Sequence, residues 1–165
     1  MNIWGWALIA IAVIALTGGL LVSGETLVMQ FEGLSLTAYQ DVAGNWTIGY
    51  GHLIVPGDPY YPYGSIKTIT QAQAQALLAQ DMATADNCVS QSVTVPLTAN
   101  QRAALQSFVF NVGCGAFQGS TLLRLLNQGD YSAVPGQLTE WVYAGGQVVQ
   151  GLVNRRAKEA QVFAA

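Results

Sequence analysis

Two carboxylates and a hydroxyl lie close together early in the chain, with the spacing E-x8-D-x5-T formed by Glu32, Asp41 and Thr47. One carboxyl group can donate a proton to a leaving oxygen, while a second stays ionised and deprotonates a water molecule that the hydroxyl holds. Hydrolysis of a glycosidic bond requires these groups. Alone, each residue has an ordinary interpretation, as a helix-end glutamate, a turn aspartate or a strand threonine. Their combination predicts a glycosidase site.

The neighbours of each residue suggest its role. Phe31 precedes Glu32, and an apolar neighbour disfavours the charged form of a carboxyl group. Glu32 is therefore expected to carry the proton and to act as the general acid. Asp41 enters a polar hairpin, where it is expected to stay ionised and to orient and deprotonate a water molecule. Thr47 is expected to hold that water.

The elements that position these residues can also be predicted. Residues 25–32 form a short helix that Gly33 terminates. Residues 35–70 combine strand-forming side chains with Gly and Pro, which predicts a small β-hairpin lobe with an exposed loop at residues 56–64.

After this lobe the apolar residues recur with a helical period. Thr70 with Gln73, and Thr98 with Gln101, have the form of a capping box and predict the starts of two helices. Shorter helices are expected over residues 121–128, 132–143 and 151–163. The fold class is therefore α+β, with a cleft between a β-hairpin lobe and a helical lobe.

Several segments resemble signature motifs of the phage-type lysozymes (endolysins), in the order that this family has them. They are Phe31-Glu32-Gly33, Trp46 to His52, Phe110 to Gly113, Ser120 to Arg124, Trp141 to Gly146 and Gly151 to Arg156. The resemblance spans roughly residues 25–163. It implies a lysozyme-like fold and hydrolysis of β-1,4 bonds between N-acetylmuramic acid and N-acetylglucosamine in peptidoglycan, leading to host cell lysis.

The resemblance also implies roles for single residues. Glu32 would be the acid, Asp41 the residue that positions or deprotonates water, and Thr47 its assistant, with inversion at the anomeric carbon. In this family an arginine at the position of Arg155 pairs with the acid, although the adjacent Arg156 could serve instead. No cofactor or metal is implied, and we expect a monomer.

An apolar stretch precedes these motifs. Residues 3–22 are interrupted only by Thr17 and glycines, and residues 1–24 carry no charged side chain. As a helix the stretch would be about 30 Å long, the thickness of a bilayer's hydrocarbon core. It could be a retained anchor, a cleaved signal or a buried helix. A buried helix is disfavoured because a small domain seldom covers so apolar a segment, and a cleaved signal lacks the usual basic start.

The stretch is a weak anchor, since its many Gly and Ala residues contribute little transfer free energy. It resembles the signal-arrest-release segment of some phage lysozymes, which holds the enzyme inactive at the membrane until the membrane is depolarised. We therefore divide the chain into an apolar segment, residues 1–24, and a catalytic domain, residues 25–165. The protein is expected to be exported, tethered to the inner membrane through residues 3–22, and then periplasmic.

The chain has two cysteines, Cys88 and Cys114. In an oxidising periplasm they would form one disulfide, worth about 3 kcal/mol by the loss of chain entropy in the unfolded state. Two buried thiols in a reduced protein are the alternative. The apolar segment favours the disulfide, because it indicates export.

Other functions are less well supported. The net charge of −3 offers no extended basic face for nucleic acid. His52 is the only histidine, which disfavours the zinc amidases that also degrade cell walls. A peptidase that pairs His52 with Cys88 or Cys114 is an alternative, and so is a membrane-tethered wall-binding protein without catalysis.

Overall fold

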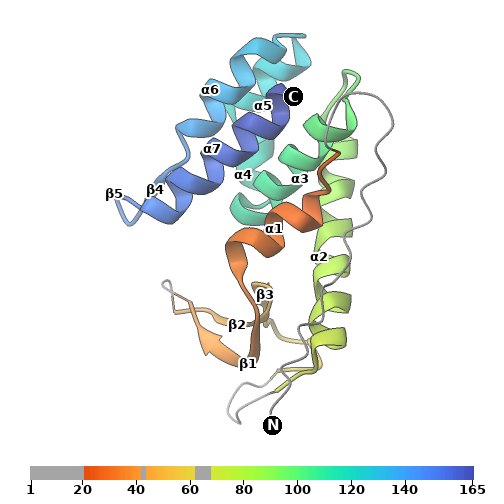
Figure 1. The fold of residues 1–165 in the computed structure, drawn as a ribbon, viewed down its shortest axis with the longest axis vertical. Coiled ribbons are helices and arrows are strands. Elements are labelled where there is room, and N and C mark those ends of the chain that lie inside the picture. Colours follow the sequence, from red (N-terminus) through yellow and green to blue (C-terminus); the bar gives the residue numbers. More distant parts are fainter. Residues whose placement is uncertain (1–20, 42–43, 62–67) are drawn as a thin grey trace, which may run out of the picture.

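The computed structural model describes residues 21–41, 44–61 and 68–165, which form two lobes joined by helices (Figure 1). Helix α1 (Gly24–Glu32) begins at Ser23, whose side chain accepts a hydrogen bond from the backbone N–H of Thr26, and ends at Gly33 with a φ of 67°. Positive φ is open to glycine without strain, so the chain turns there into the first strand. The predicted short helix and its terminating glycine are confirmed.

The smaller lobe is an antiparallel sheet of three strands in the order β1-β2-β3. The strands are β1 (Ser35–Gln40), β2 (Trp46–Gly49) and β3 (His52–Leu53). Tyr39 of β1 pairs with Thr47 of β2. Thr47, the hydroxyl residue of the predicted motif, therefore lies next to Tyr39 in the sheet. The predicted hairpin lobe is confirmed; of the predicted loop at residues 56–64, only residues 56–61 are described.

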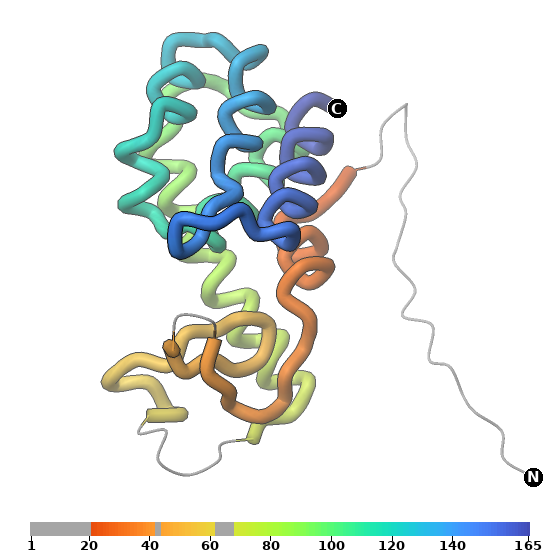
Figure 2. The backbone as a smooth tube through the Cα atoms, turned by 90° about the vertical axis from the view of Figure 1, so that its left-hand side faces the viewer, coloured from red at the N-terminus to blue at the C-terminus, as the bar shows by residue number. Residues whose placement is uncertain are grey.

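Helix α2 (Gln71–Ser92) runs from the sheet lobe to the helical lobe (Figures 1 and 2). It starts with the capping box of Thr70 and Gln73, and α3 (Ala99–Val112) starts with that of Thr98 and Gln101. Both predicted helix starts are confirmed. One face of α2 covers the sheet, where buried Leu78 and Met82 pack with Ile48.

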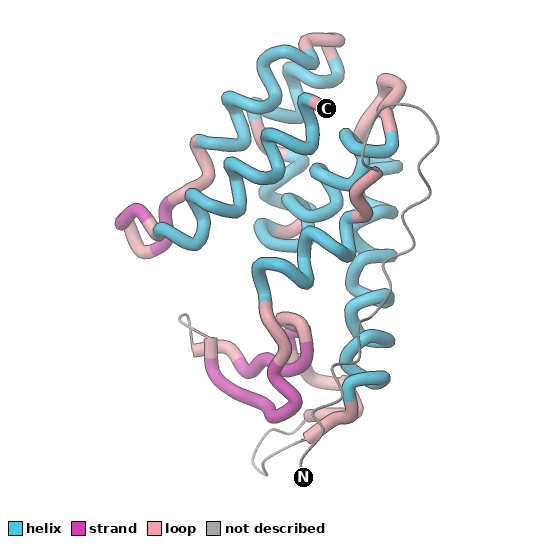
Figure 3. Tube along the Cα trace, in the orientation of Figure 1, coloured by secondary structure: helices cyan, strands magenta, loops and turns pink. Residues whose placement is uncertain are grey.

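The helical lobe surrounds α3, which packs against α1, α2 and α7. Its further elements are α4 (Cys114–Gln118), α5 (Thr121–Asn127), a short 3-10 helix η1 (Tyr131–Ala133), α6 (Val134–Thr139) and α7 (Gln150–Ala164) (Figure 3). The core of this lobe centres on Phe108, which makes edge-on ring contacts with Phe117 and Trp141.

One predicted helix is wrong. Residues 132–143 were expected to be a single helix, but helix α6 ends at Thr139 and the chain continues into a hairpin of β4 (Tyr143–Ala144) and β5 (Gln147–Val148). Gly145 and Gly146 both have positive φ in the turn. A Gly-Gly pair between two short strand-forming segments is a hairpin signal, and here it outweighs the helical period of the preceding residues.

The expected apolar helix over residues 3–22 lies outside the described residues, apart from Leu21 and Val22, which are not helical. Among the residues that the structure describes, no helix is long and apolar enough to cross a membrane.

Candidate active site

The three residues of the E-x8-D-x5-T motif border one pocket of about 240 Å³ between the two lobes. Glu32 comes from the end of α1, Asp41 from the loop after β1, and Thr47 from β2. The other lining residues are Tyr39, Asn45, Gly51, Leu53, Phe110 and Asn111. The fold thus brings the predicted acid, base and hydroxyl to a single opening.

The two carboxylate oxygens of Glu32 have different surroundings. Oε1 accepts a hydrogen bond from Nη1 of Arg155. Oε2 lies beside Gly51, where an added Cβ would be only 3.0 Å away. The Glu32 side chain is 23% exposed. Besides the apolar contact expected from Phe31, the site therefore supplies a guanidinium that holds one oxygen.

Of the two adjacent arginines, Arg155 is the partner of Glu32. Its Cζ lies 5.5 Å from the centre of the Phe31 ring and 5.9 Å from that of Phe110. These rings flank the guanidinium, and cation–π attraction stabilises its charge there. Arg156 turns the other way, to Asn111 and to the backbone oxygen of Trp141.

Asp41 closes the loop between β1 and β2. Its Oδ1 accepts from the backbone N–H of Asn45 at 2.8 Å, and its Oδ2 accepts from the Asn45 side chain at 3.2 Å. Its own backbone N–H donates to the carbonyl oxygen of Asn45 at 2.9 Å. Asp41 is thus a turn aspartate and also borders the pocket, so the two interpretations made from sequence are compatible.

Thr47 is 5% exposed and its hydroxyl donates to the carbonyl oxygen of Asn45 at 3.3 Å. Because the proton of the hydroxyl points to Asn45, the lone pairs of the oxygen are left to accept a hydrogen bond from the pocket side. The geometry is suited to holding a water molecule.

Sequence reasoning missed Tyr39 as a residue of the site. Burial raises the pKa of Tyr39, and the negative charges of Glu32 and Asp41 raise it further. The phenol therefore stays protonated and can donate a hydrogen bond into the pocket. Its pairing with Thr47 would have placed it there, but that register is not visible without the sheet.

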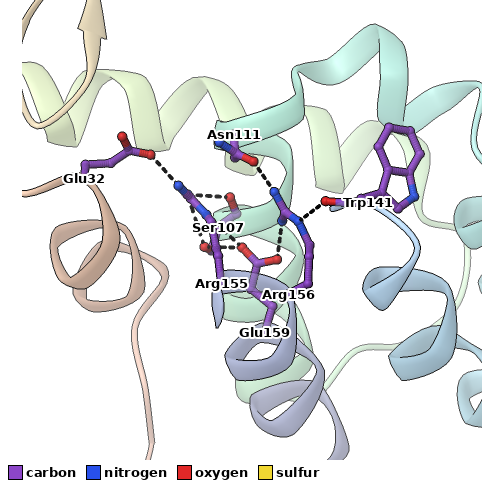
Figure 4. A network of polar contacts seen from close by, with 7 residues as sticks. All are labelled: Glu32, Ser107, Asn111, Trp141, Arg155, Arg156 and Glu159. Carbon is purple, nitrogen blue, oxygen red and sulfur yellow. Dashed lines mark hydrogen bonds and ion pairs between the residues drawn. The ribbon is translucent and has the colours of Figure 1, made fainter. Parts of the chain in front are cut away.

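Behind Glu32 lies a buried network of charged side chains (Figure 4). Arg155, Arg156 and Glu159 are 3%, 0% and 0% exposed. Glu159 pairs with both arginines and accepts from the Ser107 hydroxyl at 2.6 Å. The basic cluster of the C-terminal helix is therefore largely paired with the protein's own carboxylates.

Two larger pockets adjoin the one at Glu32. One, of about 380 Å³, shares Gly51, Leu53 and Phe110 with it. The other, of about 850 Å³, shares Asn111 with it and reaches Tyr143 on the β4–β5 hairpin. A row of adjoining hollows suits a polymer more than a small isolated ligand.

The alternative of a Cys–His peptidase is contradicted. Cys88 and Cys114 form a disulfide between α2 and α4, which confirms the predicted bond. Neither cysteine therefore has a thiol that could act as a nucleophile. Both ring nitrogens of His52 are engaged, Nε2 with Asp58 at 2.7 Å and Nδ1 with Asp81 at 2.9 Å. His52 joins the sheet to α2.

Comparisons with known proteins agree with this arrangement. The sequence profile of the phage lysozyme family matches residues 29–159. A SAR-endolysin of Enterobacteria phage PA-2 is 40% identical over 96% of this chain and 88% of that protein, and a SAR-endolysin of Enterobacteria phage P21 is 38% identical over the same shares.

Solved structures of lysozyme-type proteins are also similar to this chain. The muramidase domain of SpmX from Asticaccaulis excentricus has a TM-score of 0.75 and 36% identity, covering 86% of this chain and 95% of that one. A mutant of P22 lysozyme has a TM-score of 0.71 and 37% identity over the same shares.

Proposed function

The chain belongs to the phage lysozyme family and is therefore a glycoside hydrolase of peptidoglycan, and we propose that Glu32, Asp41 and Thr47 carry its reaction. The family, the lysozyme-like fold and the activity expected from the sequence motifs are confirmed. The proposal adds the bond, the β-1,4 linkage between N-acetylmuramic acid and N-acetylglucosamine, and the role of each residue.

In the proposed reaction Glu32 gives its proton to the glycosidic oxygen as the bond from that oxygen to the anomeric carbon breaks, with the electron pair going to the oxygen. Water on the opposite face attacks the anomeric carbon, and Asp41 takes the proton that this water loses. Thr47 holds the water. Since Arg155 occupies Oε1 of Glu32, the transferred proton is assigned to Oε2, beside Gly51.

One observation carries the proposal: three elements bring Glu32, Asp41 and Thr47 to the same pocket. The location of Glu32 and Asp41 on one opening supports the division into acid and base. Inversion is proposed with this division, because water and the leaving group then act on opposite faces of the sugar. It is tested by the anomer first released from a β-linked substrate, which NMR should identify as α.

The assignment of the acid is tested with the full chain carrying Glu32→Gln. Glutamine has the size of glutamate but no proton to transfer, so clearing of a peptidoglycan suspension should fall by roughly a hundredfold to ten-thousandfold. Glu25→Gln is the matched control, since Glu25 is an exposed glutamate in the same helix. Substantial activity in a folded Glu32→Gln protein would refute the assignment.

The same assay addresses the alternative of wall binding without catalysis. A wall-binding protein would sediment with peptidoglycan and leave the turbidity of the suspension unchanged. The family and the structural relatives favour hydrolysis, so we expect the turbidity to fall.

We further propose that the protein is exported and that residues 3–22 hold it at the inner membrane before it acts in the periplasm as a monomer. Residues 1–20 lie outside the described part of the chain. The proposal is supported by the apolar sequence, by the Cys88–Cys114 disulfide, which needs an oxidising compartment, and by relatives described as SAR-endolysins.

A further inference from the structure

Glu159 is a fully buried carboxylate on α7 that contacts neither the pocket nor Glu32 directly. It lies between the two guanidiniums of the network, with Arg155 four residues and Arg156 three residues before it. The two positive charges of Arg155 and Arg156 are balanced by the two negative charges of Glu159 and Glu32. A buried ion is retained only where partners compensate its loss of hydration, so each member of this network depends on the others.

We propose that Glu159 is a positioning residue for the reaction, which fixes Arg155 against Glu32 and Arg156 against the wall of the same pocket. The inference rests on the proposed role of Glu32 as the acid. It concerns a residue that has no contact with the reacting atoms and acts through the two arginines.

The first arm of the network runs through Arg155. Its Nε donates to Oε1 of Glu159 at 3.2 Å, and its Nη2 donates to the carbonyl oxygen of Ser107 at 3.1 Å. With these two groups held, Nη1 is left pointing at Glu32. Ser107 also donates to Oε1 of Glu159, so the helices α3 and α7 fix the guanidinium together.

The second arm runs through Arg156. It pairs with Oε2 of Glu159, and it donates through Nη2 to Oδ1 of Asn111 and through Nε to the backbone oxygen of Trp141 at 3.2 Å. Asn111 borders the pocket of Glu32. Because Arg156 occupies the oxygen of this amide, the NH₂ group is directed away from Arg156 and is free to turn to the pocket side. One carboxylate thus orders groups on two sides of the site.

Glu159 also balances the positive charge behind the acid. Burial lowers the pKa of Arg156, and the charge of Glu159 opposes that change. Without Glu159, Arg155 and Arg156 would lose the buried negative charge that compensates both of them, and Glu32 would remain the carboxylate paired with this part of the network.

Other charged and titratable groups lie on the elements that surround Glu32. They are Tyr39 and Asp41 from β1 and its loop, Arg155 and Arg156 from α7, and Asp86 with Arg102, which pair with each other between α2 and α3. A substitution at Glu159 removes none of these groups, and of them only Arg155 and Arg156 lose a partner by it.

The test compares the full chain with its Glu159→Gln variant on soluble, dye-labelled peptidoglycan fragments. We expect kcat to fall about tenfold through the misplaced acid, with a smaller change in KM, less than about twofold, through Asn111 at the pocket wall. Glu25→Gln, with the same loss of charge at an exposed site, should change neither.

A folded Glu159→Gln protein with the native kcat would overturn the inference. If this variant does not fold, Glu159→Asp takes its place, since it keeps the charge and moves the carboxylate back by one methylene group. It should lower kcat severalfold, and a native kcat, or failure of this variant to fold as well, would leave Glu159 a purely structural role. Activity retained in Glu32→Gln would instead refute the proposed function, so the two failures are distinguishable.

Discussion

The chemistry of Glu32 depends on the difference between its two oxygens. Arg155 holds Oε1, while Oε2 has space only because residue 51 has no side chain. Gly51 has a φ of 85°, so a side chain at this position would meet both backbone strain and the carboxylate. A side chain at position 51 would therefore press on the carboxylate of the acid.

Gly51→Ala is predicted to reduce wall-clearing activity severalfold, because the added methyl group would push Oε2 of Glu32 from its position by a few tenths of an ångström and the rate depends on the placement of the acid. It should also lower the free energy of unfolding by about 1 kcal/mol or more through its positive φ. The measurements are turbidity clearing and chemical denaturation of the same preparation.

Gly129→Ala is the matched control for this prediction. Gly129 has a φ of 84°, and nothing lies within 4 Å of an added Cβ. The Gly129→Ala protein should have a lower free energy of unfolding but the same wall-clearing activity per folded molecule. Equal activity in the two variants would contradict the argument from Glu32.

The motif of Glu32, Asp41 and Thr47 is local, which is why its spacing could be recognised from sequence. Arg155 lies 123 residues from Glu32, and no feature of the sequence distinguished it from Arg156 except the resemblance to a family. Glu159 carried no signal at all, since a buried carboxylate looks like any other glutamate until the packing of α7 on α3 is known.

At the scale of elements, His52 fastens the end of the sheet to α2. The hydrogen bond with Asp81 is the main cause that raises its pKa to about 9, outweighing the opposing effect of burial with the help of Asp58. A pKa raised above the unfolded value of about 6.5 means that the folded state binds the proton more tightly. The stability from this group is complete below about pH 6.5 and is lost as the pH rises through about 9.

His52→Gln should therefore destabilise the protein by about 3 kcal/mol below pH 6.5, with a difference from the native chain that shrinks between pH 6.5 and 9. Chemical denaturation at a series of pH values measures it. An NMR titration gives the pKa directly, since the chain has one histidine. In Asp81→Asn this pKa should fall, and an unchanged value would contradict the assigned cause.

The disulfide joins α2 to α4 and closes a loop of 26 residues in sequence separation. Its reduction is predicted to lower the free energy of unfolding by about 3 kcal/mol through the entropy of the unfolded chain. Neither cysteine borders the pocket of Glu32, although Cys114 lines the adjoining pocket, so the protein kept reduced without alkylation should still clear peptidoglycan at a temperature where it stays folded. Denaturation and turbidity assays of the oxidised and reduced forms measure this, and inactivation of folded, reduced protein would contradict it.

Elements with a local chemical signal were predictable and those set by tertiary contacts were not. The capping boxes at Thr70 and Thr98 gave the starts of α2 and α3. The helix expected over residues 132–143 instead ends at Thr139. The Gly145-Gly146 pair was a local signal of the hairpin that follows, but the hydrogen bond from Arg156 to the backbone oxygen of Trp141 comes from α7 and could not be seen in the local sequence.

At the scale of the whole molecule, the folded domain begins inside the apolar stretch. The backbone N–H of Val22 donates to Oδ1 of Asn100 at 3.3 Å, and Val22 packs against the core of the helical lobe. Gly24 is buried with Gln106 and Met82 so near that an added Cβ would lie within 3.0 Å of both. The start of α1 is thus tightly enclosed, eight residues before Glu32, so in the proposed membrane-held form folding of the domain would compete with the bilayer for the end of the stretch.

From this competition we predict that the protein sediments with membranes while the membrane potential is maintained and moves to the soluble fraction once it is dissipated. In the proposed anchor, the glycines and alanines of residues 3–22 contribute little transfer free energy and would hold the chain weakly in the bilayer. A double variant with Gly18→Leu and Gly19→Leu adds apolar surface without adding charge, so it should stay with the membrane and clear walls slowly. Cell fractionation with immunodetection before and after adding an ionophore measures both. If the native protein stays in the membrane fraction after the potential is dissipated, the predicted release is contradicted, and the end of the segment remains in the bilayer.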